Sequence, residues 1–144
     1  MMSEALTKFN QVENALVALL ESIPDLSGRI SIGEHVAKPD FPRATVFAER
    51  VQARESTIAG RKMTHYWTFI IVIDHVTGDY REGYEKMKEL FWAIYEKIMS
   101  NRSLGLNGDV FATPATDSRL ERALAERNYG FSWWIEVIVR VAEL

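Results

Sequence analysis

The chain has 144 residues, of which 47% are hydrophobic and 26% charged, with a formal net charge of −3 and no cysteine. Its length is that of one domain with a core of its own. The absence of cysteine excludes disulfides, thiolate metal sites and cysteine nucleophiles. A weakly acidic balance without blocks of like charge argues against general affinity for nucleic acid. No stretch approaches the ~20 apolar residues of a membrane helix, and the start, MMSEALTKFN, has no signal-peptide pattern.

The first expected element is a helix from Ser3 to Ser22. Its apolar residues recur at helical spacing and form one stripe, while Ser3 is a suitable N-cap and Pro24 ends the segment. A short strand is expected from Arg29 to Val36. The loop AKPDFP, residues 37–42, follows and contains two prolines.

A long hairpin is expected next. One arm runs from Arg43 to Glu55, Ile58-Ala59-Gly60 forms the turn, and the other arm runs from Arg61 to Val76. The sequence of the hairpin becomes polar and basic toward its tip. We therefore expect the tip to project from the body of the domain.

The returning arm is apolar on both faces at its centre. Successive side chains of a strand point to opposite sides of the sheet, so a half-exposed strand would alternate apolar and polar residues. Here one face carries Trp67, Phe69, Ile71 and Ile73, and the other carries Tyr66, Ile70 and Val72. Both faces should be covered. The chain contains two good helices, which are enough to cover one face of the sheet. The apolar residues on the other face therefore predict that a partner covers it.

A second helix is expected from Asp79 to about Ser100. Asp79 and Glu82 have the spacing of a capping box. Apolar residues line one side of this helix and charged residues the other. Trp92 lies on the charged side, which is unusual for so large an apolar residue.

The C-terminal part is expected to be a loop from 101 to 117, with a short strand over Asp109–Ala112, and a final strand over Tyr129–Ala142. Between them, Ser118–Asn128 reads either as helix or as strand. The whole is a single domain, residues 1–144, of the α+β class. We expect a mostly antiparallel sheet with a long β-hairpin and the two main helices packed on one face.

No arrangement of residues predicts catalysis. His65 and His75 share a strand but lie ~33 Å apart at strand spacing, too far to share a metal or a proton. With His35 they are the only histidines, and we interpret them as solvated or lightly hydrogen-bonded. Phosphate-loop, dinucleotide and serine-nucleophile motifs are absent from the sequence. We therefore expect no enzyme activity, no cofactor and no metal.

The remaining candidates are surface residues. Trp92 is either a binding anchor or a cover for a loop of its own chain. On the second sheet face, Trp134 and Ile138 join Ile70 and Val72 as interface candidates, unless residues 118–128 cover them. Basic residues on the hairpin either contact an acidic partner or nucleic acid, or keep an exposed hairpin from aggregating. These basic residues are Arg50, Arg54, Arg61 and Lys62.

The order and pattern of elements resemble the tail-terminator, or tail-completion, proteins of tailed bacteriophages and prophages, a group of minor tail proteins. The matching stretches are the helix NALVALLESIP, the entry FPRATVFAER into the hairpin, the returning strand HYWTFIIVIDHV, the helix YEKMKELFWAIYEKI and the final strand WWIEVIVRV. Together they span nearly the whole chain. The resemblance rests on this order of elements and on no diagnostic motif.

The resemblance implies a structural protein without catalysis or cofactor. Members commonly form a ring of six subunits at the head-proximal end of the tail tube, where the ring ends tube polymerisation and joins the head connector. It implies the virion tail as the final location, with assembly in the cytoplasm of the host bacterium. In such a ring we expect sheet and helix surfaces of adjacent subunits to meet near Trp92 or Trp134.

Two other interpretations remain open. In the first, the chain is a dimeric α+β enzyme or ligand-binding domain. Its second sheet face packs against the same face of a second copy, and its pocket involves His35 or His65. Alternatively it is another phage neck or baseplate component with a similar body.

Overall fold

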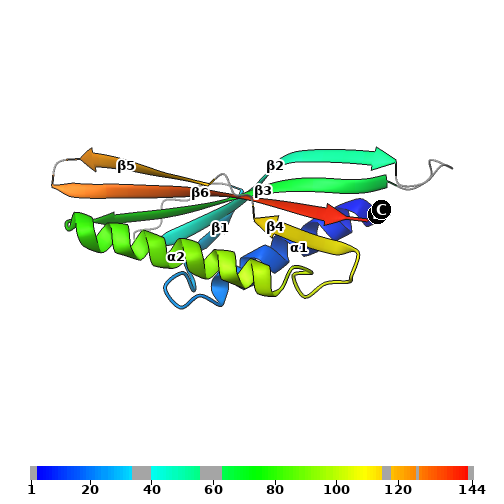
Figure 1. The fold of residues 1–144 in the computed structure, drawn as a ribbon, viewed down its shortest axis with the longest axis horizontal. Helices are drawn as coiled ribbons and strands as arrows, with labels where there is room; N and C mark the ends of the chain where they lie inside the picture. The colour runs from blue at the N-terminus through cyan, green and yellow to red at the C-terminus, as the bar shows by residue number, and fades with distance from the viewer. Residues whose placement is uncertain (1–2, 34–39, 56–62, 115–117, 126, 143–144) are drawn as a thin grey trace.

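The computed structural model describes residues 3–33, 40–55, 63–114, 118–125 and 127–142 (Figure 1). Two helices and six strands follow one another in the order α1 (Glu4–Glu21), β1 (Ile30–Ile32), β2 (Arg43–Glu55), β3 (Met63–Thr77), α2 (Tyr80–Ser100), β4 (Val110–Pro114), β5 (Arg119–Ala125) and β6 (Asn128–Val141). The expected α+β class is confirmed.

The six strands form one sheet in which β3 lies between β2 and β6. The strand order is β1-β2-β3-β6-β4, and β5 also pairs with β6. Only the short β1–β2 pairing is parallel. β4 and β5 use different lengths of β6: β5 pairs with residues 128–134 and β4 with residues 137–141. The two short strands therefore lie end to end beside one long strand (Figure 1).

The expected hairpin is present as β2 and β3, paired from Arg43↔Asp74 to Glu55↔Met63. Its turn, 58–60, and its basic residues Arg61 and Lys62 lie outside the described residues, as does the projection expected of the tip. The first strand is shorter than expected, because it ends at Ile32 and Gly33 follows with a φ of +78°. The rest of the expected strand, through Val36, is not among the described residues.

The segment that reads as helix or strand is the strand β5. Its pairing with β6 runs from Arg119↔Trp134 to Ala125↔Asn128. The residues have good helical propensity, but backbone pairing with an available strand edge overrides a preference worth only tenths of a kcal/mol per residue. β5 extends the sheet sideways and does not cover its second face.

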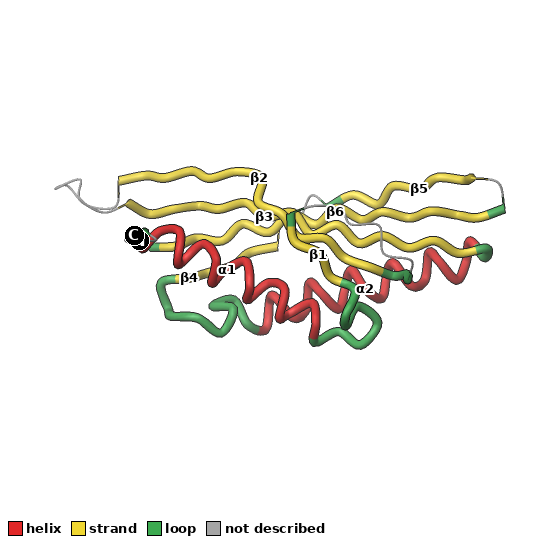
Figure 2. Tube along the Cα trace, turned by 180° about the vertical axis from the view of Figure 1, so that it is seen from behind, coloured by secondary structure: helices red, strands yellow, loops and turns green. Residues whose placement is uncertain are grey.

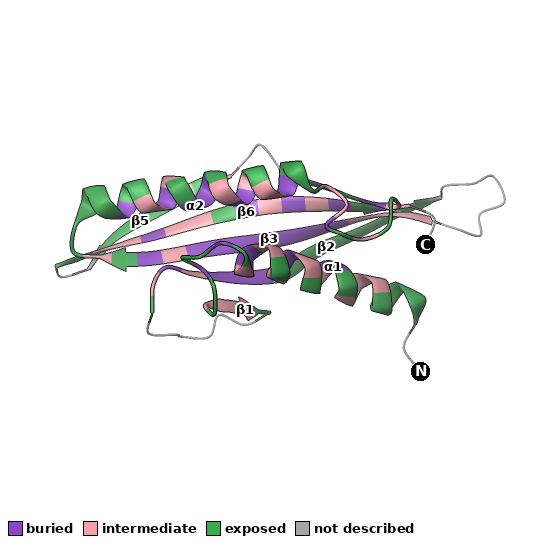
Figure 3. Ribbon diagram, turned by 90° about the horizontal axis from the view of Figure 1, so that it is seen from below, coloured by how far each residue is buried: buried purple, intermediate pink, exposed green. Residues whose placement is uncertain are grey.

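Both helices pack on the same face of the sheet (Figure 3). Phe9 of α1 contacts the rings of Trp67 and Phe69 at centroid distances of 5.0 and 5.2 Å. The buried core joins α1, the turn after it, the odd-numbered residues of β3, α2 and the odd-numbered residues of β6. Its main members are Val12, Leu16, Leu20, Trp67, Phe69, Ile71, Ile73, Met87, Leu90, Ile94, Ile98, Ile135, Val137, Val139 and Val141.

The start of α2 is capped as expected, but only by one half of a capping box. Asp79 Oδ1 accepts from the backbone N–H groups of Arg81 and Glu82 at 3.0 and 3.3 Å. The N–H of Asp79 donates to Thr77 Oγ1 and not to Glu82. The hydrogen bond from the Thr77 hydroxyl, with a smaller effect of His75, lowers the pKa of the Glu82 carboxyl.

His75 differs from the expectation of a solvated histidine. It lies on the helix side of β3, is buried, and places Nε2 3.3 Å from Glu82 Oε2. The odd-numbered side of β3 lies beneath α2, and this position removes the ring from solvent.

Gly83 is the point of closest approach between α2 and the sheet. A Cβ built on Gly83 would overlap the ring of Phe131 and lie 2.7 Å from Thr77 Cγ2. Glycine therefore allows the first turn of α2 to rest on β6, at the cost of poorer helix propensity.

We predict that Gly83→Ala destabilises the fold by about 1–3 kcal/mol through overpacking, although alanine alone favours the helix by about 1 kcal/mol. Urea unfolding measures the difference. Gly108→Ala is the control, because a Cβ there has no neighbour within 4 Å. A Gly83→Ala protein as stable as the wild type would show that α2 does not rest on β6 at this residue.

Candidate functional site

The sheet face opposite the helices is open among the described residues (Figure 2). An apolar area, the sheet-face patch, occupies its centre and consists of Phe47, Ile70, Val72, Trp134 and Ile138. Ile70 and Val72 are only 6% and 7% exposed, because side chains of β2 and β6 flank them. Trp134 is 45% exposed. The patch thus has an apolar floor on β3 and an exposed tryptophan at its side.

Cross-strand register assembles this patch. Val72 pairs with Trp134 on one side and Thr45 on the other, and Ile70 pairs with Phe47 and Glu136. The rings of Phe47 and Trp134 meet edge to face across β3 with centroids 6.1 Å apart. Such contacts between residues on neighbouring strands are the basic stabilising unit of a sheet face.

A hollow of about 780 Å³ lies beside Trp134 on this face. Ile70 and Trp134 form its apolar part. Its charged residues are three carboxylates and one guanidinium, namely Glu49, Glu121, Glu136 and Arg119. The hollow is therefore apolar at the base and predominantly anionic around it.

A second apolar surface, the α2 flank, lies on the helix side and consists of Tyr80, Tyr84, Trp92, Tyr95 and Trp133. The first four residues follow one side of α2 at helical spacing. Trp133 of β6 stacks on Phe91 with centroids 4.4 Å apart and an interplanar angle of 10°. Trp92 contacts Phe91 and Tyr95 edge to face, at 5.0 and 5.4 Å, and remains 52% exposed.

The α2 flank faces away from α1. On the other side of α2, Lys86 forms an ion pair of 3.0 Å with Asp25, in the turn after α1, which raises the pKa of Lys86. Toward β5, the aromatic flank borders Leu124, which is also exposed. Side chains connect α2 to β5 here: Arg122 Nη1 donates to Tyr80 Oη, and its guanidinium lies 5.9 Å from the Tyr80 ring centre. Leu124 and Trp92 remain exposed.

The structure separates the sequence-predicted tryptophans. The ring of Trp92 contacts Phe91 and Tyr95 of its own helix. Trp134 and Ile138 lie with Ile70 and Val72 on the second face, as expected from their alternation. The two tryptophans therefore belong to different surfaces on opposite sides of the sheet.

Two of the four candidate basic residues of the hairpin, Arg50 and Arg54, are among the described residues and lie in the second half of β2. Arg50 is exposed and pairs across the sheet with Thr68, next to a register irregularity between Ala48 and Arg50. The guanidinium of Arg54 lies 5.6 Å from the ring centre of Tyr66. Arg61 and Lys62 are outside the described residues.

Sequence reasoning missed Phe47, Trp133 and the two tyrosines at the start of α2 as surface residues. Phe47 could have been found, because the hairpin register places it opposite Ile70. Trp133 shares the helix side of β6 with Phe131 and Ile135, as the alternation of the strand implies, and it packs against the core. The partial exposure of Trp133, however, depends on how far α2 extends across β6, and no local sequence pattern indicates this.

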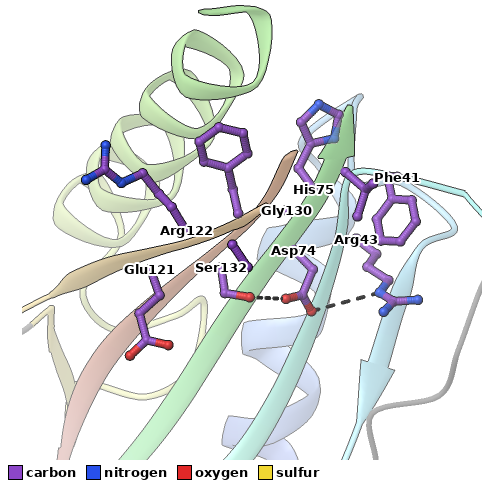
Figure 4. Close-up of a pocket in the computed structure, with 11 residues that line it drawn as sticks. Phe41, Arg43, Asp74, His75, Glu121, Arg122, Gly130 and Ser132 are labelled. Carbon is purple, nitrogen blue, oxygen red and sulfur yellow. Dashed lines mark hydrogen bonds and ion pairs between the residues drawn. The ribbon is translucent and has the colours of Figure 1, made fainter. Parts of the chain in front are cut away.

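A smaller pocket of about 250 Å³ contains a polar row across three strands (Figure 4). Ser132 Oγ donates to Asp74 Oδ1 at 2.5 Å, and Arg43 Nε lies 3.9 Å from Asp74 Oδ2. His75 follows Asp74 but points to the helix side and interacts with Glu82. Ser132 thus has a carboxylate and no imidazole beside it. This row can hold β2, β3 and β6 in register, and it ends the sheet-face patch.

Among the described residues, no group of histidine, aspartate and glutamate side chains is arranged to hold a metal ion. Within the same residues, neither helix has the length and apolar character needed to cross a membrane. No family model matches the chain, and no curated protein matches its sequence.

We predict that Trp134→Ala costs about 1 kcal/mol or less in the free energy of unfolding, because half-exposed residues contribute little packing. Trp67→Ala is the matched comparison: its indole is 2% exposed beneath α1, and its loss should cost about 3–5 kcal/mol. Urea unfolding at a dilution where the protein is monomeric measures both. Equal losses would mean that the chain itself covers Trp134.

Proposed function

We propose that the protein is a structural subunit of a phage or prophage tail, which assembles into a ring on the head-proximal end of the tail tube. The ring ends tube polymerisation and provides the surface that the head connector meets. The observation that carries this proposal is the sheet-face patch, an apolar area in the middle of the sheet that neither helix covers.

An open apolar face of this kind fits a protein that functions in an assembly. Large contiguous apolar areas on soluble domains commonly mark interaction sites. The polar row at Asp74 and the charged residues around Trp134 border the area, as polar residues commonly border the buried centre of an interface. The element order resembling tail terminators supplies the identity of the assembly.

The alternative is a dimeric α+β domain that binds a small ligand. Packing the sheet-face patch against its twin would cover Trp134. It would leave the α2 flank, with Trp92 at 52% exposure, open on the other side of the sheet. The second surface therefore favours an assembly in which each subunit has two neighbours.

The first test is the mass in solution across a range of concentrations, measured by light scattering. We expect a species of about six times the 16.5 kDa chain mass, either free or once tail tubes are present. A stable dimer that persists with tubes would favour the ligand-binding alternative instead.

The second test measures tube length directly. A tail-tube protein is polymerised with increasing amounts of the protein, and tube lengths are measured by electron microscopy. We expect mean tube length to fall as the protein rises, with density for a ring at one end. Trp134→Arg, which places a charge in the sheet-face patch, should cap poorly. Tube lengths that do not change when the wild-type protein is added, whether or not that protein binds to the tubes, would contradict the proposal.

A further inference from the structure

We propose that neighbouring copies meet through unlike surfaces: the α2 flank of one copy packs on the sheet-face patch of the next, with Trp92 in the hollow beside Trp134. The inference deepens the proposed function and rests only on its claim that the chain assembles with itself. The partner at both surfaces is thus a second copy of this chain.

The placement of the two surfaces is the first argument. Trp133 and Trp134 are consecutive on β6 and point to opposite faces of the sheet. Trp133 stacks on Phe91 of α2, and Trp134 contacts Phe47 on the open face. A two-fold contact buries the same surface of both copies and leaves the other surface in water. A head-to-tail contact buries one surface of each kind in every subunit, and the next copy binds in the same way.

Shape is the second argument. α2 lies on the outside of the sheet on its side (Figure 3). Trp92 is the most exposed large aromatic residue of α2. On the opposite face, the sheet is hollowed beside Trp134, over Ile70. An exposed aromatic side chain entering an apolar-based hollow is the usual form of an interface hot spot.

Charge is the third argument. The side chains of two cationic residues lie over tyrosine rings of the α2 flank. Lys88 Nζ is 4.7 Å from the ring centre of Tyr84, and the Arg122 guanidinium is 5.9 Å from that of Tyr80. Lys88 Nζ also donates to Glu85, and Arg122 Nη1 donates to Tyr80 Oη. The hollow holds Glu49, Glu121 and Glu136 against Arg119. The hollow thus has an excess of carboxylates, and the two cations at the α2 flank complement it. Lys88 does so only in part, because Glu85 already pairs with it.

A mixing experiment tests the unlike pairing. Trp92→Glu disables the α2 flank and brings a further carboxylate toward the anionic hollow. Trp134→Arg disables the sheet-face patch and brings a cation toward Lys88 and Arg122. Each variant alone should be monomeric by light scattering. Their equimolar mixture should form a dimer of twice the 16.5 kDa chain mass and grow no further, since only one intact surface of each kind is available.

Circular dichroism and urea unfolding of each variant verify that it is folded, which the half-exposed positions of both tryptophans favour. A mixture that stays monomeric would overturn the inference. So would a single variant that dimerises alone, which indicates a like-with-like contact, or variants that keep the wild-type mass. A wild-type chain that is monomeric at the highest reachable concentration, with and without tail tubes, would overturn it too.

A matched substitution tests the charge argument separately. Trp92→Lys removes the same ring as Trp92→Glu but brings a cation to the hollow, so it should weaken assembly at least tenfold less at low ionic strength. Equal weakening by the two substitutions would show that charge does not contribute to the contact.

The mixing result and the tube-length result are independent. Dimers in the mixture without capping of tubes would reject the tail function alone, and capping without dimers would reject this contact alone.

Discussion

The register of β3 between β2 and β6 is the constraint on which the rest of the structure depends. It places Trp67, Phe69, Ile71 and Ile73 under the helices and Ile70 and Val72 on the open face. Because side chains alternate along a strand, a slip of one residue would exchange the two sets. Residues of both sets are apolar, so the hydrophobic pattern of β3 alone would tolerate that slip. A slip of one residue would, however, break the interactions of the polar row formed by Arg43, Asp74 and Ser132.

The consequence of this register is a sheet that is apolar at its centre on both sides and covered on one. The core under α1 and α2 can stabilise the subunit by itself, since it contains most of the large buried side chains. On the open face, Ile70 and Val72 are already buried by neighbouring side chains, whereas Trp134 remains 45% exposed. The aromatic and aliphatic side chains of this face gain burial when another molecule covers them, and this gain is available to drive assembly.

α2 links the core to the α2 flank, the surface through which we propose that copies meet. Its inner side contributes Met87, Leu90, Ile94 and Ile98 to the core, and its outer flank presents Trp92. Gly83 lets the first turn rest on Phe131, which holds the helix close to β6. The position of the aromatic flank therefore depends on packing inside the subunit. A change in the core under α2 is expected to alter assembly as well as stability.

The sequence by itself determined the elements whose pattern is local. The helical stripe of α1, the arms of the hairpin, the Asp79 cap and the alternation of β6 follow from the spacing of residues near one another in the chain. Tertiary structure decided what depends on partners distant in sequence. The strand β5 forms because the edge of β6 accepts it, and Phe47 meets Trp134 because β3 aligns them. Trp133 and Trp92 lie at the α2 flank because the backbone of α2 packs over β3 and β6, while it meets β5 through the side-chain contact of Tyr80 with Arg122. Local spacing says which way a side chain points, and only the packed neighbours decide whether anything covers it.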